Sequence, residues 1–240
     1  NVKHRHGLEN AVYLSTPINA LVEGFYEERT TMGDVKTHGD FGLGTFNHLD
    51  GEMVLLDGMA YQIRADGTVA AVRDDEYTPF ACVTFFRPDT WDDIGDSLGA
   101  PDIFDLLDRL IPSPNMLYAV RIEGGFRSVK ARAMPKTDNY IPLVEAAKHQ
   151  AVFEFSDVEG SLVGFFPPDF MVSLNAPGYH LHFLPADRSH GGHVMSCRLG
   201  SARIGIQHIQ RLEVDLPFTL DPLTARLDRD AKEDLGKAER

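Results

Sequence analysis

The sequence predicts an α+β fold in which mixed and antiparallel β-sheets are accompanied by a few short helices. Short apolar runs such as "MVLL" and "TVAAV" are separated by Asp-Gly pairs between residues 33 and 87. This pattern is typical of a β-meander, because Asp-Gly suits turns that need positive φ. The segment "SVKARAM" at 128–134 alternates between polar and apolar residues, as a strand does. Many strands with few helices indicate the α+β class.

Helical spacing of apolar residues is confined to short segments. In the first of them, Thr16 offers a capping hydroxyl and Pro17 suits the first helical position. The second follows Pro101 and is stopped by two further prolines. The charged tail from residue 221 is expected to be either a partly ordered helix or a frayed end. We expect helices at 15–28, 101–110 and 142–149.

The strands are expected in two groups with a division near residues 140–150. Asp50-Gly51, Asp57-Gly58 and Asp66-Gly67 supply turns in the first group, and Gly124-Gly125 is expected to turn the chain within 116–134. Arg132 then points away from Val129 and Ala131, because alternate residues of a strand face opposite sides. Further strands are predicted at 151–155, 161–166, 179–184, 193–199 and 202–214.

Composition narrows the classes of partner. The formal net charge of -13 argues against a nucleic-acid or anionic-membrane surface. No apolar run approaches the roughly 20 residues that span a bilayer. Cys82 and Cys197 are too few for a disulfide framework or a Cys-rich metal site, and we expect both to be buried. With no visible leader, a cytoplasmic protein is expected, and secretion is the alternative.

Histidine is concentrated in one segment. "GYHLHFLPADRSHGGHV", residues 178–194, holds four of the ten histidines. In a strand, "YHLHF" places His180 and His182 on the face opposite its three apolar residues, which makes a chelating pair for a divalent cation. His190 and His193 follow in the turn and the next strand, and we prefer His193 as the third ligand because it opens the run "HVMSC".

Three neutral histidines leave coordination positions open, as in a catalytic rather than a structural zinc site. The residues therefore predict a metal enzyme. A cupin also uses His-x-His on a strand, but its usual nearby Glu ligand is missing here, since the nearest acid is Asp187. A metal-dependent hydrolase would use the same histidines to activate water, and a non-catalytic sugar- or metal-binding module would use them to bind a ligand without product.

Three blocks of sequence resemble the α-acetolactate decarboxylase family. They are "GDFGLGTFNHLDGEMVLLDGMAYQIRADGTV" at 39–69, "GGFRSVKARAMP" at 124–135 and the histidine-rich segment at 178–194, in the order found in that family. The resemblance implies a two-domain fold, with a mixed-sheet domain at 1–145 and an antiparallel-sheet domain at 146–240 that binds the metal. It also implies a homodimer, a small-molecule substrate and no organic cofactor.

The resemblance also assigns site residues. It places zinc ligands on His180, His182 and His193, and leaves His190 without a role. It places further site residues on Thr45, Glu52 and Arg132. An acidic residue near the C-terminus also reaches the metal region in this family, and Glu239 is its best positional counterpart here, with Glu233 and Asp234 as alternatives.

The implied reaction converts 2-acetolactate to acetoin and carbon dioxide. Loss of carbon dioxide leaves electrons that must be held as an enediolate, and a cation chelated by the substrate would stabilise that charge. Arg132 is expected to recognise the carboxylate or to steady the enediolate, and Glu52 to deliver a proton to one face of the enediolate. Thr45 is expected to orient the substrate by hydrogen bonding, and Glu239 to close or tune the metal site.

Overall fold

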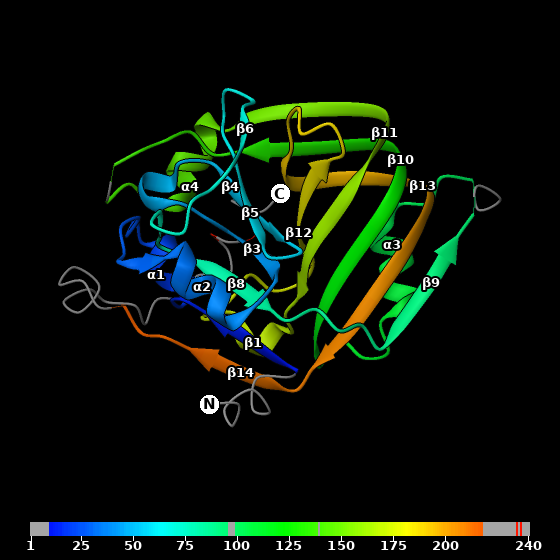
Figure 1. The fold of residues 1–240 in the computed structure, drawn as a ribbon, viewed down its shortest axis with the longest axis horizontal. Helices are drawn as coiled ribbons and strands as arrows, with labels where there is room; N and C mark the ends of the chain where they lie inside the picture. The colour runs from blue at the N-terminus through cyan, green and yellow to red at the C-terminus, as the bar shows by residue number, and fades with distance from the viewer. Residues whose placement is uncertain (1–9, 96–98, 139, 218–233, 235, 237–240) are drawn as a thin grey trace.

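Two β-sheets, packed face to face, form the body of the molecule in the computed structural model. The structure describes residues 10–95, 99–138 and 140–217, together with 234 and 236. Figure 1 shows the two sheets side by side, with β3, β4 and β8 in one and β10, β11 and β13 in the other. The predicted combination of mostly β-sheet with a few short helices is confirmed.

The first sheet is seven-stranded and mixed, in the order β14-β1-β8-β3-β4-β5-β6. Its strands β3 to β6 form the expected antiparallel meander, and only the pairing of β1 with β14 is parallel. Gly51, Gly58 and Gly67 have φ values of 84°, 79° and 86°, as the Asp-Gly turns predict. The strands are β1 Ala11–Leu14, β3 Phe41–Thr45, β4 Glu52–Leu56, β5 Met59–Ile63, β6 Val69–Ala71, β8 Ala81–Thr84 and β14 Arg211–Val214.

The second sheet is antiparallel and five-stranded, in the order β10-β11-β12-β13-β9. It also closes on itself, because β10 pairs with β13 as well as with β11. Its strands are β9 Thr90–Ile94, β10 Leu117–Ala133, β11 Ala151–Phe166, β12 His180–Pro185 and β13 Gly192–Ile209. A separate two-stranded pair is formed by β2 Thr30–Thr31 and β7 Tyr77–Thr78.

The long strands correct the prediction of a turn at Gly124-Gly125. Strand β10 runs through this pair, with a bulge between Gly124 and Phe126. A Cβ on Gly124 would lie 2.5 Å from the carbonyl oxygen of Ser201, so the glycine allows close approach of β13 rather than a reversal. Strand β11 likewise joins the two strands predicted at 151–155 and 161–166. Strands β13 and β14 replace the two strands predicted at 193–199 and 202–214.

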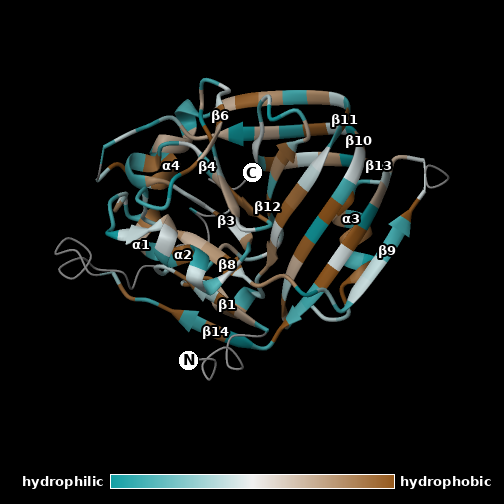
Figure 2. Ribbon diagram, viewed as in Figure 1, coloured by the Kyte–Doolittle hydropathy of each residue, from teal (hydrophilic) through white to brown (hydrophobic). Residues whose placement is uncertain are grey.

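Alternation along the strands divides the core. Leu181 and Phe183 of β12 pack inside the closed five-stranded sheet, in a cluster that includes Leu107 of helix α3, Ile103–Leu110. Leu184 faces the seven-stranded sheet and packs with its strands. Figure 2 shows the alternating hydrophilic and hydrophobic bands along β10, β11 and β13. His180 and His182 lie on the face opposite Leu181 and Phe183, as the strand pattern predicts, and that face is buried between the two sheets.

The helices are shorter than predicted, and one was not foreseen. Helix α1 is confined to Ile18–Val22, with Pro17 rather than Thr16 at its N-cap, and Gly24 follows it with φ of 90°. Helix α4 spans Leu143–Ala146 and continues as the 3-10 turn η4, Ala147–His149. Two further 3-10 turns are η2 Asn47–Leu49 and η5 Asp169–Met171.

Helix α2, Met32–His38, begins where the sequence suggested the meander. Thr31 and Asp34 form a capping box, in which the Thr31 hydroxyl accepts from the backbone N–H of Asp34. This Thr-x-x-Asp pattern was missed, because the Asp-Gly turns that follow it indicated a meander from residue 33. The helix covers the outer face of the seven-stranded sheet through Met32 and Val35.

The two sheets exchange strands across the boundary expected at residues 145 and 146. Strands β9 and β10 precede it and belong to the five-stranded sheet, whereas β14 follows it and joins the seven-stranded sheet. As a division into folding units, 1–145 and 146–240 stays a prediction. Among the described residues, no helix has the length and apolar character needed to cross a membrane.

Candidate metal centre

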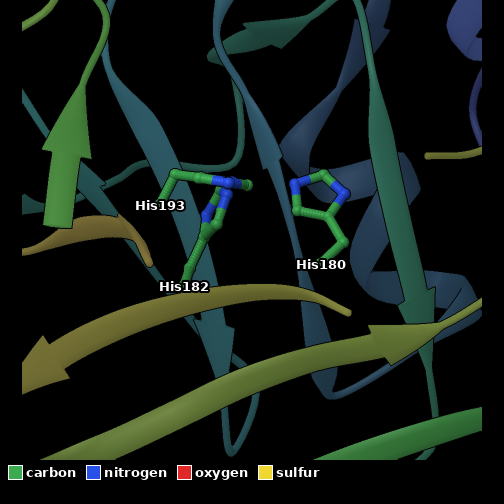
Figure 3. A group of neighbouring side chains, drawn as sticks. All are labelled: His180, His182 and His193. Atoms are coloured by element: carbon green, nitrogen blue, oxygen red, sulfur yellow. The ribbon is translucent and has the colours of Figure 1, made fainter. Parts of the chain in front are cut away.

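Three histidine side chains meet between the two sheets. His180 and His182 lie on β12, and His193 lies directly opposite His182 on β13. One ring nitrogen of each lies within 4.8 Å of the others, and all three side chains are buried. Figure 3 shows the three imidazole rings turned toward one another, and their centroids are separated by 5.1, 5.2 and 5.6 Å. The hairpin thus gathers three nitrogen ligands, the donor type that zinc prefers along with thiolate.

The tautomer of His182 is set by the neighbouring sheet. Its Nδ1 lies 2.8 Å from the carbonyl oxygen of Met53 on β4, and a carbonyl can only accept a hydrogen bond, so Nδ1 carries the proton. Nε2 is then the atom with a lone pair, and it is buried without a hydrogen-bond partner among the described residues. A lone pair in this position fits a metal ligand whose other nitrogen donates to a carbonyl.

The histidines are held in the uncharged form that binds metal. Burial lowers the pKa of His180 to about 3, and the positive charge of Arg132 acts in the same direction. Burial also holds the pKa of His182 well below its ordinary value, and the repulsion that a second proton would meet from His180 and from Arg132 acts in the same direction. Neither imidazole competes for a proton at neutral pH, so both nitrogens stay available to a cation.

The glycines before His193 allow its strand to approach β10 and β12 closely. Gly191 and Gly192 have φ values of 151° and 123°. A Cβ on Gly192 would lie 2.0 Å from the carbonyl oxygen of Arg132, which no side chain can tolerate. The pair "GG" is therefore required by the position of His193 rather than by a tight turn alone.

An acid and a guanidinium lie beside the histidines. Glu52 begins β4 of the seven-stranded sheet, and Arg132 lies opposite His193 on β10. Arg132 Nη1 donates to Glu52 Oε1 at 3.1 Å, and Glu52 Oε2 lies 3.5 Å from Nε2 of His182. Both charged side chains are buried, so each depends on the other for charge compensation.

Thr45 lies next to Glu52 across the ladder of β3 and β4. Its hydroxyl donates to the carbonyl oxygen of Gly51 at 2.6 Å. Sequence reasoning gave this hydroxyl to the substrate, whereas in the structure its proton is used by the turn that precedes Glu52. The lone pairs of the oxygen are the part of Thr45 that can meet a ligand.

A pocket with about 380 Å³ of empty volume connects these residues. Its polar side carries the three histidines with Thr45, Glu52 and Arg132. Its apolar side was not foreseen, because the pattern of these residues in the sequence is the same as that of ordinary core residues. The apolar lining is Ile18, Leu21, Leu49, Phe80, Met134 and Leu143.

Of the remaining predicted residues, the structure describes His190 and Asp234. His190 is not one of the three clustered histidines, and its Nδ1 lies 3.2 Å from the carbonyl oxygen of Gly67. Glu239 and Glu233 fall outside the described residues. Asp234 is described, but it does not belong to the group of possible ligands formed by the histidines.

Comparison with known proteins supports the resemblance. The family model "Alpha-acetolactate decarboxylase" matches residues 12–229. The chain is similar to an alpha-acetolactate decarboxylase of Methanosarcina mazei, 42% identical over 96% of this chain and 81% of the relative. It is also similar to one of Raoultella terrigena, 40% identical over 88% of this chain and 82% of the relative.

Solved structures show the same fold. The crystal structure of alpha-acetolactate decarboxylase from Bacillus subtilis strain 168 superposes with a TM-score of 0.91 at 34% identity, covering 95% of this chain and 99% of that one. A Staphylococcus aureus protein described as similar to alpha-acetolactate decarboxylase has a TM-score of 0.89 at 26% identity, covering 95% and 100%. The chain belongs to the alpha-acetolactate decarboxylase family.

Proposed function

We propose that this protein decarboxylates 2-acetolactate to acetoin and carbon dioxide with a zinc ion held by His180, His182 and His193. The observation that carries the proposal is the meeting of three buried histidines with Glu52 and Arg132 in one pocket between the sheets. Family membership supplies the substrate, because the curated relatives are named for it.

The three histidines fit a zinc ion through the chemistry of their donors. Zinc accepts imidazole nitrogen readily, and a site with three protein ligands leaves room for substrate oxygens. The buried Nε2 of His182 carries a lone pair and makes no hydrogen bond among the described residues. Zinc bound there would supply Lewis-acid stabilisation of the negative charge that develops as carbon dioxide leaves.

The reaction breaks one carbon–carbon bond and adds one proton. When the bond to the carboxylate breaks, its electron pair stays on the substrate, and a proton must then be added to the same carbon. Glu52 is the acid in the pocket, and we assign it to that proton transfer. Because Glu52 is fixed on one strand, it delivers the proton to one face and so sets the chirality of acetoin.

Arg132 receives the substrate carboxylate. A guanidinium carries five N–H donors in a planar fork, which lets one side chain hold Glu52 and meet a second carboxylate. A carboxylate bound there would share the guanidinium with Glu52, so the substrate would lie beside the acid that we assign to proton transfer. Arg132 thereby couples substrate binding to proton delivery.

Thr45 and Glu239 have supporting roles in this proposal. Thr45 fixes the turn before Glu52 through Gly51, and its lone pairs can accept a hydrogen bond from the substrate hydroxyl. Glu239 is assigned to closing the metal site on the ground of family membership alone. Deleting the chain from residue 230 tests this assignment, and unaltered kinetics would remove the tail from the site.

The experiment that tests the function is acetoin formation from racemic 2-acetolactate, before and after chelation and with zinc added back. Activity that is lost with chelation and restored by zinc supports both the reaction and the metal. A folded, zinc-loaded protein that forms no acetoin would contradict the proposed reaction. Ester or amide hydrolysis by the same sample would then indicate a metal hydrolase.

Family membership and composition support three proposals about the setting of the enzyme. We infer a homodimer from the family, which sedimentation of the purified protein tests. We infer a cytoplasmic enzyme because Cys82 and Cys197 are both buried and unpaired, as a reducing compartment favours. A small molecule is the expected partner, and the net charge of -13 makes nucleic acid an unfavourable one.

A further inference from the structure

His190, the histidine outside the cluster, links the hairpin that carries His193 to the sheet that carries Glu52. It lies in the connection between β12 and β13, three residues before His193. Its ring stacks on Phe153 of β11, with centroids 5.1 Å apart and planes 13° apart. Its Nδ1 lies 3.2 Å from the carbonyl oxygen of Gly67, in the turn between β5 and β6. His190 therefore contacts both sheets.

The start of β13 is held by few registered pairs, two with β12 and two with β10 before an irregularity in that ladder. Strands β12 and β13 share only two registered pairs, His182 with His193 and Phe183 with Gly192. On the other side, the ladder with β10 is interrupted by an irregularity between Lys130 and Ala131. Two glycines with positive φ precede His193, so the chain immediately before it has little stiffness of its own. An anchor just upstream would limit where His193 can lie.

The turn that receives His190 is itself firmly built. Gly67 N–H donates to the carbonyl of Arg64 at 2.9 Å, and Arg64 N–H donates to the carbonyl of Thr68 at the same distance. The Asp66 carboxylate accepts from both the backbone N–H and the hydroxyl of Thr68. A Cβ on Gly67 would lie 2.7 Å from Nδ1 of His190, so the absence of a side chain is what permits the contact.

This turn is connected directly to the acid of the site. Strand β5 leads into it, and Ile63 at the end of β5 pairs with Glu52 on β4. The same Ile63 lies against the hairpin, because a Cβ on Gly191 would be 3.1 Å from its Cδ1. A displacement of the hairpin relative to β5 would thus change the separation of His193 from Glu52.

We propose that His190 is a positioning residue that sets the third zinc ligand, His193, against the sheet bearing Glu52. The proposal rests on the zinc site proposed above. It gives a role to His190, the one histidine of the segment 178–194 that is not a proposed ligand. His190 acts through the Gly67 carbonyl and the Phe153 ring, and it does not touch the metal. Because a neutral or a protonated imidazole can donate through Nδ1, this role does not require a change of charge.

The first test measures the dissociation constant of zinc by competition with a chromophoric chelator. His190→Ala is expected to weaken zinc binding about tenfold, at the low end for residues that orient ligands indirectly. His190→Gln keeps a donor for the Gly67 carbonyl and is expected to recover part of the affinity. His208→Ala is the control, because His208 is also on β13 but does not line the pocket, and its ring packs on Tyr118 with centroids 5.5 Å apart. It is expected to leave zinc affinity unchanged.

A pair of glycine variants tests the same contact from its other side. Gly67→Ala and Gly58→Ala both place alanine at a similar positive φ, 86° and 79°, and so carry similar backbone strain. Only Gly67→Ala brings a Cβ against His190, since a Cβ on Gly58 meets nothing within 4 Å. Gly67→Ala should weaken zinc binding and alter the visible absorption of the cobalt-substituted protein, and Gly58→Ala should do neither.

Zinc affinity within twofold of wild type in both His190→Ala and Gly67→Ala would overturn the proposal. An equal loss of zinc affinity in the controls His208→Ala and Gly58→Ala would also overturn it. A wild-type protein that binds zinc but forms no acetoin would contradict the proposed reaction, while the zinc constants would still decide the role of His190. A wild-type protein that binds no zinc would overturn both.

Discussion

The two sheets contribute different kinds of residue to the pocket. The five-stranded sheet supplies the three candidate ligands, His180, His182 and His193, from neighbouring positions of one hairpin, and their ring nitrogens lie within 4.8 Å of one another. The seven-stranded sheet supplies Thr45 and Glu52, whose place in the pocket depends on how the two sheets pack. The histidines are brought together mainly by the pairing of two neighbouring strands. Thr45 and Glu52 reach the histidines only because the two sheets pack together.

This difference implies that binding of metal and transfer of the proton can be lost separately. A change on the hairpin should remove the metal and everything that depends on it. A change on β3 or β4 should leave the metal in place and impair what happens to the substrate. Arg132 connects these two groups of residues, because it lies opposite His193 in register and donates to Glu52.

The largest effect is expected for His182→Ala. This variant removes the ligand whose tautomer is fixed by Met53, and two histidines hold zinc poorly. Loss of several kcal/mol of charge stabilisation corresponds to a fall of about 10³-fold or more in kcat/KM. Zinc content by atomic absorption and acetoin formation measure it. An active, metal-free His182→Ala protein would reject the ligand assignment.

Glu52→Gln should separate metal binding from proton transfer. Glutamine keeps the shape of the side chain and can still accept from Arg132, but it cannot deliver a proton, so turnover should fall by about 10²-fold or more while zinc is retained. The variant removes the negative charge that pairs with the buried Arg132, so its melting temperature must be measured and assays run well below it. Near-normal turnover with unchanged acetoin chirality would show that Glu52 is not the proton donor.

Thr45→Val should also reduce turnover while zinc is retained, but by a smaller factor than Glu52→Gln. Valine has a similar shape but cannot donate to the Gly51 carbonyl, so a buried acceptor loses its partner at a cost of about 1 to 3 kcal/mol of stability. The turn before Glu52 then loosens, and kcat should fall about tenfold, which corresponds to roughly 1.4 kcal/mol. Thr45→Ser retains the hydroxyl and should recover most of the activity. If serine and valine reduced kcat equally, the hydroxyl would have no positioning role.

The comparison also explains what the sequence could predict. His-x-His on a strand, with a third histidine after the next turn, is a pattern of spacing, and spacing is local. The opposite faces predicted for His180 and Leu181 were therefore correct, and so was the choice of His193 over His190 as the neighbour of the pair. Glu52 and Thr45 carried no such pattern, and only the resemblance to a family singled them out.

The wrong predictions concern features that depend on contacts between distant parts of the chain. Gly124-Gly125 was read as a turn because glycine pairs often reverse a chain, but here they accommodate the closing contact between β10 and β13, which spacing cannot show. The apolar lining of the pocket and the contacts of His190 likewise depend on the packing of two sheets. Long-range docking was therefore the part that sequence patterns did not reach.

The smallest effect is expected at an ion pair that joins the two sheets outside the pocket. Asp57, in the turn between β4 and β5, accepts from Arg121 of β10 through both carboxylate oxygens, at 2.6 and 3.0 Å. The hydrogen bonds and charge of Arg121 outweigh partial burial and lower the pKa of Asp57 below its ordinary value. Since the Asp57 side chain is 69% exposed, the pair should contribute only about 0.5 kcal/mol.

The sign of the pH dependence follows from that lowered pKa. The folded state favours ionised Asp57, so the stabilisation is present above the unfolded pKa of about 3.9 and is lost as the pH falls through the folded value. Urea unfolding should therefore find Asp57→Asn less stable than wild type at pH 7, with the difference gone near pH 2.

Asp157→Asn is the matched control, because Asp157 is similarly exposed, also has positive φ, and pairs with Arg127 within one sheet. If the pair with Arg121 helps to dock the sheets, Asp57→Asn but not Asp157→Asn should also reduce the enantiomeric excess of acetoin. Equal chirality in both variants would show that packing of the two sheets alone holds Glu52 against the zinc ligands.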